Sequence, residues 1–217
     1  MDAIIGGAGV LVSGTIVTIQ LFLVSSLLML FCSFVAGVGR LVPFWPVRTL
    51  AIVYIEVFRG TSLVVQLFWF YYALPFFGFS LDAYTAATLG LGLCFGAYGA
   101  EVVRGAILAV PKGQFEAATA LNITPLDRMR SIILPQAILI MLPSLSNLLI
   151  LMLKSTSAAS LITLQELTFE GYTLNVRTLA TVEIFTVILL AYFVLASTIS
   201  FAMRRLELWV GRWRKRV

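Results

Sequence analysis

Long stretches without a charged side chain dominate the polarity pattern of this chain. Five such stretches cover residues 3–39, 60–81, 83–100, 131–153 and 184–203. Each approaches or exceeds the roughly 20 residues with which a helix crosses the hydrocarbon core of a bilayer. Continuous apolar runs favour helices, because backbone groups in lipid must pair within their own segment, whereas the strands of a barrel would alternate in polarity.

The pattern therefore predicts an all-α integral membrane protein that forms a single domain over residues 1–217. By length we expect five transmembrane helices, at about 10–38, 61–79, 83–108, 132–153 and 183–203. A polar loop at 111–130 separates the third helix from the fourth. A short amphipathic helix is expected near residues 47–58, at the cytoplasmic interface.

Small residues mark the third expected span. Gly92 and Gly96 have the small-xxx-small spacing that lets two helices approach closely. Such a surface serves either a contact between two copies or packing within one subunit, and the sequence leaves both interpretations open.

Composition agrees with a membrane protein and narrows its chemistry. Charged residues make up 12% of the chain, about half the fraction typical of soluble domains, and the mean hydropathy is +1.02. Cys32 and Cys94 both lie inside apolar stretches, so we expect neither a disulfide nor a metal role for them. The chain contains no His, and neither a metal site nor a catalytic nucleophile is predicted.

The distribution of Lys and Arg predicts the orientation. Basic residues gather after the first, third and fifth expected spans, and only Lys154 and Arg177 fall on the other side. Since cytoplasmic loops carry the excess of basic residues, we expect the N-terminus outside and the C-terminus in the cytoplasm. The basic C-terminal tail with Trp209 and Trp213 is typical of an anchor at the lipid interface, and no nucleic-acid partner is predicted.

The loop at 111–130 has the local chemistry of two short helices joined by a turn. Glu116–Leu121 is rich in helix formers, and its alanines permit close approach to another protein. Asn122 is expected to end this helix, because Asn tolerates a left-handed conformation nearly as well as Gly. Thr124, before Pro125, is suited to cap the next helix.

At this point the chain resembles a known family. The permease subunits of ATP-driven (ABC) importers carry a cytoplasmic loop that reads E-A-A, three residues, G, nine residues, I-x-L-P. Here Glu116-Ala117-Ala118 is followed at the same spacing by Asn122, where Gly is usual, and then by Ile132, Leu134 and Pro135.

Three further segments are similar to blocks of the polar-amino-acid permeases, which handle histidine, arginine, glutamine, glutamate or opines. These segments are FRGTSLVVQLF at 58–68, AEVVRGAI at 100–107 and LKSTS at 153–157. The resemblance implies a permease of a bacterial inner membrane that imports such a compound. Implied partners are an ABC ATPase subunit, an identical or homologous permease subunit and a periplasmic solute-binding protein.

The chain is not expected to be an enzyme, since it lacks the G-x-x-x-x-G-K-[ST] phosphate loop of an ATPase. We expect it to bind no cofactor, with ATP and Mg²⁺ on the partner ATPase. The alternative is a stand-alone secondary transporter or channel, or a membrane assembly subunit that transports nothing. Secondary carriers often show two inverted halves, and five spans without a visible repeat argue against that class.

Candidate functional residues form two groups, of which the resemblance implies the first. The coupling loop to the ATPase comprises Gly113, Glu116, Ala117, Ala118, Leu121, Asn122 and Pro135, with Glu116–Leu121 as the docking helix. A possible translocation pathway or gate comprises Gln66, Glu101, Lys154, Ser155, Thr156 and Ser157.

Several of these residues have simpler interpretations. Glu101 lies three residues before Arg104 and could form a local ion pair. Lys154 could extend to the membrane interface instead of lining a pathway. Glu166 and Glu170, on the external segment, could meet a binding protein or a cationic substrate, or merely be solvated.

Overall fold

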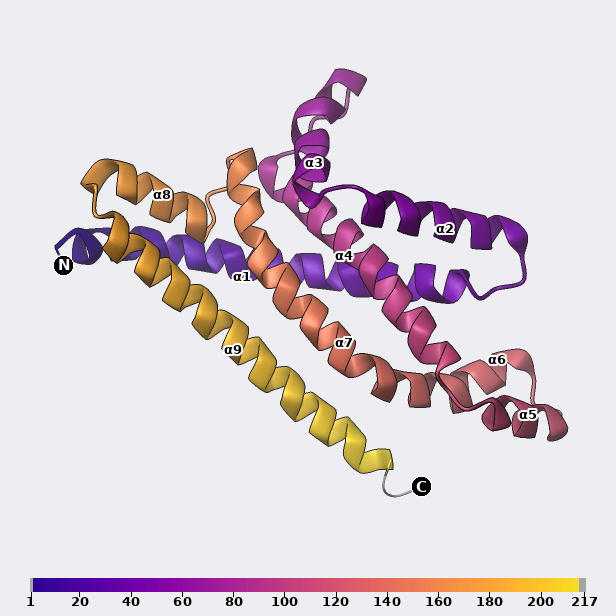
Figure 1. Ribbon diagram of the computed structural model, residues 1–217. Helices are drawn as coiled ribbons and strands as arrows, with labels where there is room; N and C mark the ends of the chain where they lie inside the picture. Colours follow the sequence, from indigo (N-terminus) through magenta and orange to yellow (C-terminus); the bar gives the residue numbers. More distant parts are fainter. Residues whose placement is uncertain (1, 215–217) are drawn as a thin grey trace.

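The computed structural model describes residues 2–214, with side chains placed for residues 7–211, and all regular structure in this part of the chain is helical (Figure 1). The nine α-helices are α1 (Asp2–Gly39), α2 (Trp45–Gly60), α3 (Leu63–Phe68), α4 (Ala83–Leu108), α5 (Lys112–Ala120), α6 (Pro125–Arg128), α7 (Leu134–Ser155), α8 (Leu167–Thr178) and α9 (Thr181–Arg214). Four short elements join them: the π-helical turns η1 (Trp69–Ala73) and η3 (Met129–Ile133), and the 3₁₀-helices η2 (Leu74–Phe77) and η4 (Thr156–Ile162).

Four helical stretches of the described residues are long and apolar enough to cross a membrane. They are Gly7–Gly39, Ala83–Leu108, Pro125–Ile162 and Thr181–Gly211. A fifth span exists only if Trp45–Gly60 and Leu63–Phe77 count as one, and these two segments are bent by 105°. The prediction of an all-helical membrane protein with about five spans is thus confirmed, with one span of unusual form.

The second expected span, 61–79, is not a single straight helix. The chain passes from α3 through η1 and η2, and Gly78, at φ 87°, ends the segment. Pro75 accounts for the irregularity, because it has no amide hydrogen to donate and its ring crowds the carbonyl four residues earlier. The amphipathic helix expected at 47–58 is α2, which buries Ala51 and Ile55 against α1 and α4 and so belongs to the bundle.

The two π-helical turns share a sequence context. Each ends directly before a Leu-Pro pair, Leu74-Pro75 after η1 and Leu134-Pro135 after η3. The Leu amide donates to the carbonyl five residues back, that of Trp69 in one turn and of Met129 in the other. A widened turn therefore accommodates the proline ring while the helix continues.

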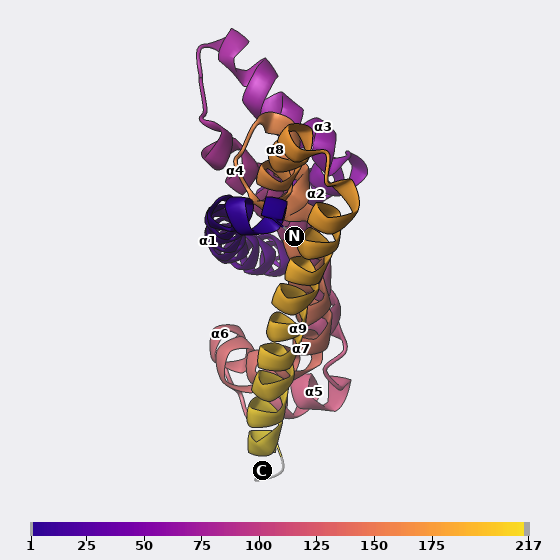
Figure 2. The same ribbon diagram turned by 90° about the vertical axis from the view of Figure 1, so that its left-hand side faces the viewer.

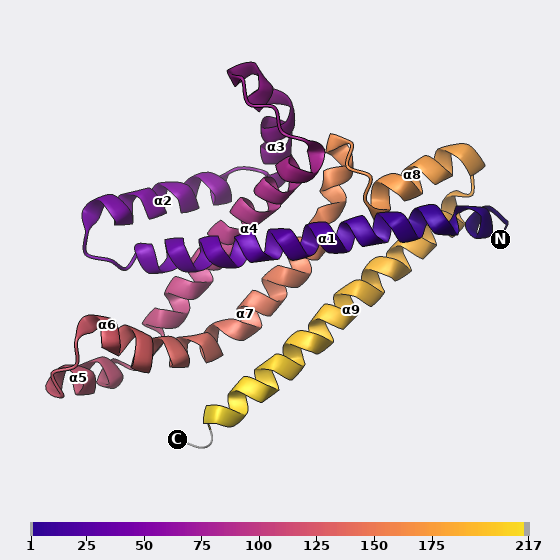
Figure 3. The same cartoon turned by 180° about the vertical axis from the view of Figure 1, so that it is seen from behind.

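Helices α1 and α4 lie side by side along much of their length, and Figure 3 shows α1 in front of α4 and α7. Glycines on α4 permit this approach. A Cβ atom at Gly92 would lie 2.6 Å from Leu28 Cδ2, and one at Gly96 would lie 2.7 Å from Cys32 Cβ. The small-residue surface of α4 therefore serves packing within the subunit, against α1.

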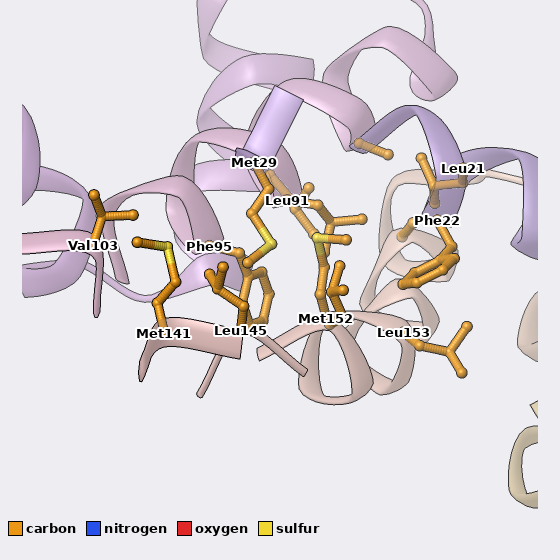
Figure 4. Packing of buried hydrophobic residues seen from close by; sticks show 14 of the residues in the cluster. Leu21, Phe22, Met29, Leu91, Phe95, Val103, Met141, Leu145, Met152 and Leu153 are labelled. Atoms are coloured by element: carbon orange, nitrogen blue, oxygen red, sulfur yellow. The ribbon is translucent and has the colours of Figure 1, made fainter. Parts of the chain in front are cut away.

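The main core lies where α1, α4 and α7 meet (Figure 4). Met29 on α1, Leu91 and Phe95 on α4, and Met141 and Met152 on α7 are all nearly or fully buried. Helix α9 packs on α7, but only 11% of the residues in its most apolar stretch are buried by the rest of the described chain. Most of its surface is thus left for lipid or another protein.

Candidate functional site

The segment between α4 and α7 forms a helical hairpin of α5 and α6 at one end of the bundle. Figures 1 and 2 show this hairpin at the opposite end from α3 and α8. Pro111 precedes α5 and sets its start, and α5 covers Lys112–Ala120, beginning earlier than the expected docking helix Glu116–Leu121. From α6 the chain continues through η3 into α7 within the stretch Pro125–Ile162, so the hairpin joins directly onto a membrane span.

The side chains of α5 divide between an inward and an outward face. Ala118 is 1% exposed and packs inward. The other coupling-loop candidates around it, Gly113, Glu116, Ala117, Leu121 and Asn122, are exposed. A shallow hollow of about 370 Å³ is lined by Phe115, Glu116, Thr119 and Ala120. The outer face of α5 is therefore not covered by any other part of the chain that the structure describes, and it is slightly concave.

Asn122 ends α5 in the manner its chemistry predicts. Its φ is 56°, and its amide donates to the Thr119 carbonyl over 3.0 Å. The Ile123 amide donates to the Ala118 carbonyl, also over 3.0 Å. These two bonds form a Schellman motif, in which Asn replaces the more common Gly at the left-handed position.

Thr124 caps α6 as the sequence predicts. Its hydroxyl oxygen accepts from the Asp127 amide at 3.3 Å, and the hydroxyl donates to Asp127 Oδ2 at 2.6 Å. The reciprocal contact fixes the entry into α6 at Pro125, whose missing amide hydrogen costs nothing at a helix start.

Two side chains that sequence reasoning missed join α5 to its neighbours. Arg128 on α6 donates from Nη1 to Thr119 Oγ1 over 2.8 Å, and its guanidinium carbon lies 5.8 Å from the ring centroid of Phe115. Gln136 on α7 lies 3.4 Å from Gln114 Oε1 and also donates to the Ile132 carbonyl over 2.9 Å. Both contacts cross a turn, so no helical period in the sequence reveals them.

The candidate pathway residues are not brought together in one site. Gln66 is 7% exposed and lies at the bend between α2 and α3. Its Nε2 donates to the Phe58 carbonyl over 2.9 Å and to Thr61 Oγ1 over 2.8 Å. Gln66 thus fixes the corner between two helices.

Glu101 takes part in local ion pairs. Its carboxylate pairs with Arg40 at the end of α1 and, over 2.9 Å, with Arg104 one turn further along α4. The local ion pair expected for Glu101 is therefore present, and Glu101 also pairs with Arg40, which directly follows α1.

Lys154 lines a groove between α7 and α9, whereas the three residues after it do not. The groove has a volume of about 660 Å³, and its polar lining comprises Lys154, Tyr192, Ser197, Ser200 and Arg204. The hydroxyls of the next three residues donate instead to nearby carbonyls, over 3.0 Å for Ser155, 2.6 Å for Thr156 and 2.8 Å for Ser157.

Glu166 is the principal surprise among the acidic residues. We expected it to meet a partner or solvent on the external segment, but its exposed fraction is 0%. It caps the N-terminus of α8 by accepting from the Phe169 amide over 2.9 Å. Burial raises the pKa of this carboxyl above its usual value.

These features of fold and loop agree with the comparison to known proteins. The family described as "Binding-protein-dependent transport system inner membrane component" matches residues 29–212. The chain belongs to this family. It is a multi-pass membrane protein and the permease subunit of an amino-acid ABC importer, so the alternative of a stand-alone secondary carrier is not favoured.

Relatives in several bacteria support this assignment. The permease is 48% identical over 212 residues to the probable amino-acid ABC transporter permease protein y4tF of Sinorhizobium fredii, covering 95% of this chain and 89% of that protein. It is 38% identical over 174 residues to the glutamine transport system permease protein GlnP of Escherichia coli, covering 79% and 80%. The octopine transport system permease protein OccM of Rhizobium radiobacter is 38% identical over 218 residues, with coverage of 95% and 89%.

Solved structures share the fold. A chain of the crystal structure of an amino acid ABC transporter with histidines matches with a TM-score of 0.88 and 34% identity, over 94% of this permease and 95% of that chain. A chain of the MetNI methionine ABC transporter in an inward-facing conformation matches with a TM-score of 0.79 and 22% identity, over 94% and 97%. The permease is thus a membrane subunit that works within an ABC transporter complex. Its homologues are permease subunits, which do not themselves catalyse a reaction.

Proposed function

We propose that this permease imports a polar amino acid or a related compound across a bacterial inner membrane, with its N-terminus outside and its C-terminus in the cytoplasm. The excess of basic residues after alternate spans supports this orientation. Similarity to relatives named for glutamine and octopine transport supports the substrate class.

The hairpin of α5 and α6 couples the permease to an ABC ATPase subunit, with α5 as the docking helix. The observation that carries this proposal is the exposed outer face of α5, with Gly113, Glu116 and Ala117, on a helix that is hydrogen-bonded to both α6 and α7. A small-residue helix face can enter a groove on a partner protein. Asn122 and Leu121 shape the end of this helix, and Pro135 lies where the hairpin enters α7.

The complete importer contains an ABC ATPase subunit, a second permease that is identical or homologous, and a periplasmic solute-binding protein. ATP and Mg²⁺ bind to the ATPase subunit, and this chain holds no cofactor. Large apolar side chains on α9 that lie outside its groove with α7, among them Leu190, Val194 and Leu208, are more than half exposed, and they provide surface for lipid or for the second permease.

Helix α7 carries motion from the hairpin to the translocation pathway. It begins beside the docking helix and ends at Lys154, in the groove shared with α9. Among the candidates, Lys154 lines the pathway directly. Ser155, Thr156 and Ser157 shape the helix end beside it, whereas Gln66 and Glu101 hold the surrounding helices.

Copurification from cells that express the neighbouring genes tests the coupling assignment. Ala117→Trp places a bulky side chain on the exposed face of α5 and should remove the ATPase subunit from the purified complex. Val176→Trp is the matched control, because Val176 is 59% exposed but lies on α8, at the other end of the bundle. Retention of the ATPase and normal uptake by Ala117→Trp would refute docking through α5. A permease that moves amino acids alone and without ATP would refute the importer mechanism.

A further inference from the structure

Glu166 is the only charged side chain in the buried set of the described residues. Among the described residues no Lys or Arg pairs with Glu166, since the ion pairs there all involve Glu101. A buried carboxylate without a cation is costly unless hydrogen bonds satisfy it. The contacts of Glu166 therefore call for an explanation beyond solvation of an external loop.

Donors from two helices and the start of α8 satisfy the two carboxylate oxygens. Oε1 accepts from the Phe169 amide over 2.9 Å, and the N-terminus of α8 adds its dipole. Oε2 accepts from the Tyr192 hydroxyl of α9 over 2.9 Å. The Thr18 hydroxyl of α1 lies 3.5 Å from Oε2 and also accepts from the Leu167 amide over 3.1 Å. Glu166 thus ties α8 to both α1 and α9.

Close packing around Glu166 leaves little freedom for α8. A Cβ atom at Gly14 of α1 would lie 3.0 Å from Leu167 Cα. On the other side of α8, Gly171 packs against Ile188 of α9. In Figure 1, α8 lies next to the beginning of α1 and the beginning of α9, and it contacts both helices. Because α8 has little room to shift, substitution of Glu166 should alter the positions of its hydrogen-bond partners more than the position of the α8 backbone.

Tyr192 connects this cluster to the groove between α7 and α9. Its side chain lines the groove together with Lys154, while its hydroxyl donates to Glu166. The Thr168 hydroxyl, also on α8, lies 3.2 Å from the Tyr192 hydroxyl. A helix outside the groove thus determines the position of a side chain in its wall.

We propose that Glu166 is a positioning residue for transport, which acts through Tyr192 to hold the wall of the α7–α9 groove in place while the solute passes. The inference rests on the proposed function, in which this groove belongs to the pathway. Glu166 does not contact the solute in this role. Its loss should disturb the transfer of solute without disturbing the docking of the ATPase, which occurs at the other end of the bundle.

The test uses the complete importer in proteoliposomes and measures the number of solute molecules imported per ATP hydrolysed. The probe is the best-transported member of a panel of tritiated glutamine, glutamate, histidine, arginine and cystine. Tyr192→Phe removes the hydroxyl and retains the ring, so it keeps the fold, and Glu166→Ala removes the acceptor. We expect each variant to lower the ratio about fivefold to tenfold, a size in keeping with the loss of a charge-assisted hydrogen bond.

The double variant and two single variants decide the interpretation. Glu166→Ala with Tyr192→Phe should be no worse than either change alone, because both remove the same contact. Glu166→Gln retains a carbonyl acceptor for the Tyr192 hydroxyl, so this variant should keep most of the wild-type ratio of solute imported per ATP hydrolysed. Glu183→Gln is the control, since the Glu183 side chain is exposed and makes no hydrogen bond or ion pair with any other described residue.

A normal ratio in Tyr192→Phe would overturn the positioning role, whether or not Glu166→Ala folds. Additive losses in the double variant would overturn it as well, because they would mean that the two residues act separately. Uptake and ATP hydrolysis that fall together at a constant ratio would indicate only a structural role. A wild-type complex that imports without hydrolysing ATP would instead refute the proposed function, and this inference with it.

Discussion

The guanidinium of Arg128 donates to the hydroxyl of Thr119 over 2.8 Å and so joins the two arms of the α5–α6 hairpin. The same guanidinium lies over the ring of Phe115, on α5. An exposed hydrogen bond of this kind contributes about 1 kcal/mol, and an exposed cation–π contact about 0.5–1 kcal/mol. Together they make α5 move as one body with α6.

We expect Arg128→Ala to reduce coupling rather than docking. The ATPase subunit should still copurify, because the outer face of α5 is unchanged, but uptake per ATP hydrolysed should fall severalfold. Hydrogen exchange at the amides of α5 should be faster as the helix loosens. Arg130→Ala is the control, since the side chain of Arg130 contacts no described residue through a hydrogen bond or ion pair. Loss of the ATPase from Arg128→Ala would show that Arg128 contacts the partner directly.

The left-handed conformation of Asn122 predicts that two substitutions at this position differ in their effect on stability. Asn122→Gly should leave the permease as stable as the wild type or slightly more so, because Gly adopts φ 56° without strain. Asn122→Val should cost about 1–2 kcal/mol, because a β-branched side chain resists the left-handed conformation. Binding of the ATPase subunit, measured by titration in detergent, should weaken for Val and not for Gly. Equal binding by both would mean that the turn geometry does not matter for docking.

Two glycines of α4 should respond to alanine with opposite signs. At Gly96 a Cβ atom would lie 2.7 Å from Cys32 Cβ and from the Tyr54 hydroxyl, so Gly96→Ala should force α1 and α4 apart and lower the melting temperature. At Gly105 nothing lies within 4 Å. Gly105→Ala should raise stability by up to about 1 kcal/mol, through helix propensity alone. Thermal unfolding of the purified permease in detergent measures both changes.

The burial of Glu166 predicts how stability depends on pH. Its pKa in the folded protein lies above the ordinary value, so between these two pKa values the folded state holds a proton that the unfolded state has released. The free energy of unfolding should therefore fall as the pH rises through this window, and it should level off on either side. Glu166→Gln should abolish this part of the dependence when the free energy of unfolding is measured as a function of pH, because the amide does not titrate. An unchanged slope in that variant would assign the dependence to another group.

Local chemistry made the α5–α6 hairpin predictable. The end of α5 at Asn122 and the cap of α6 at Thr124 each depend on residues within five positions, and the structure places both where the sequence indicates. The long apolar stretches likewise predicted α1, α4, α7 and α9, because an uninterrupted apolar stretch of this length identifies a membrane-spanning helix without knowledge of its contacts.

Contacts between distant segments were not predictable. Glu166 looks like a solvated acid until α1 and α9 supply its donors, from 148 and 26 residues away. The second expected span is irregular at Pro75, and the bend that precedes it is held by Gln66, which donates to the Phe58 carbonyl and the Thr61 hydroxyl. A polarity pattern records which residues avoid water, but it does not record which of them meet.

Thr18, Glu166 and Tyr192 are far apart along the chain, and their order has a consequence for biosynthesis. A ribosome that makes the protein delivers Thr18 first and Tyr192 last of the three, so the cluster closes only once α9 has entered the membrane. A nascent chain halted before that point lacks the Tyr192 donor to Oε2 of Glu166, while Oε1 keeps the Phe169 amide. Completion of this cluster therefore marks the point of synthesis at which α1, α8 and α9 are first held together.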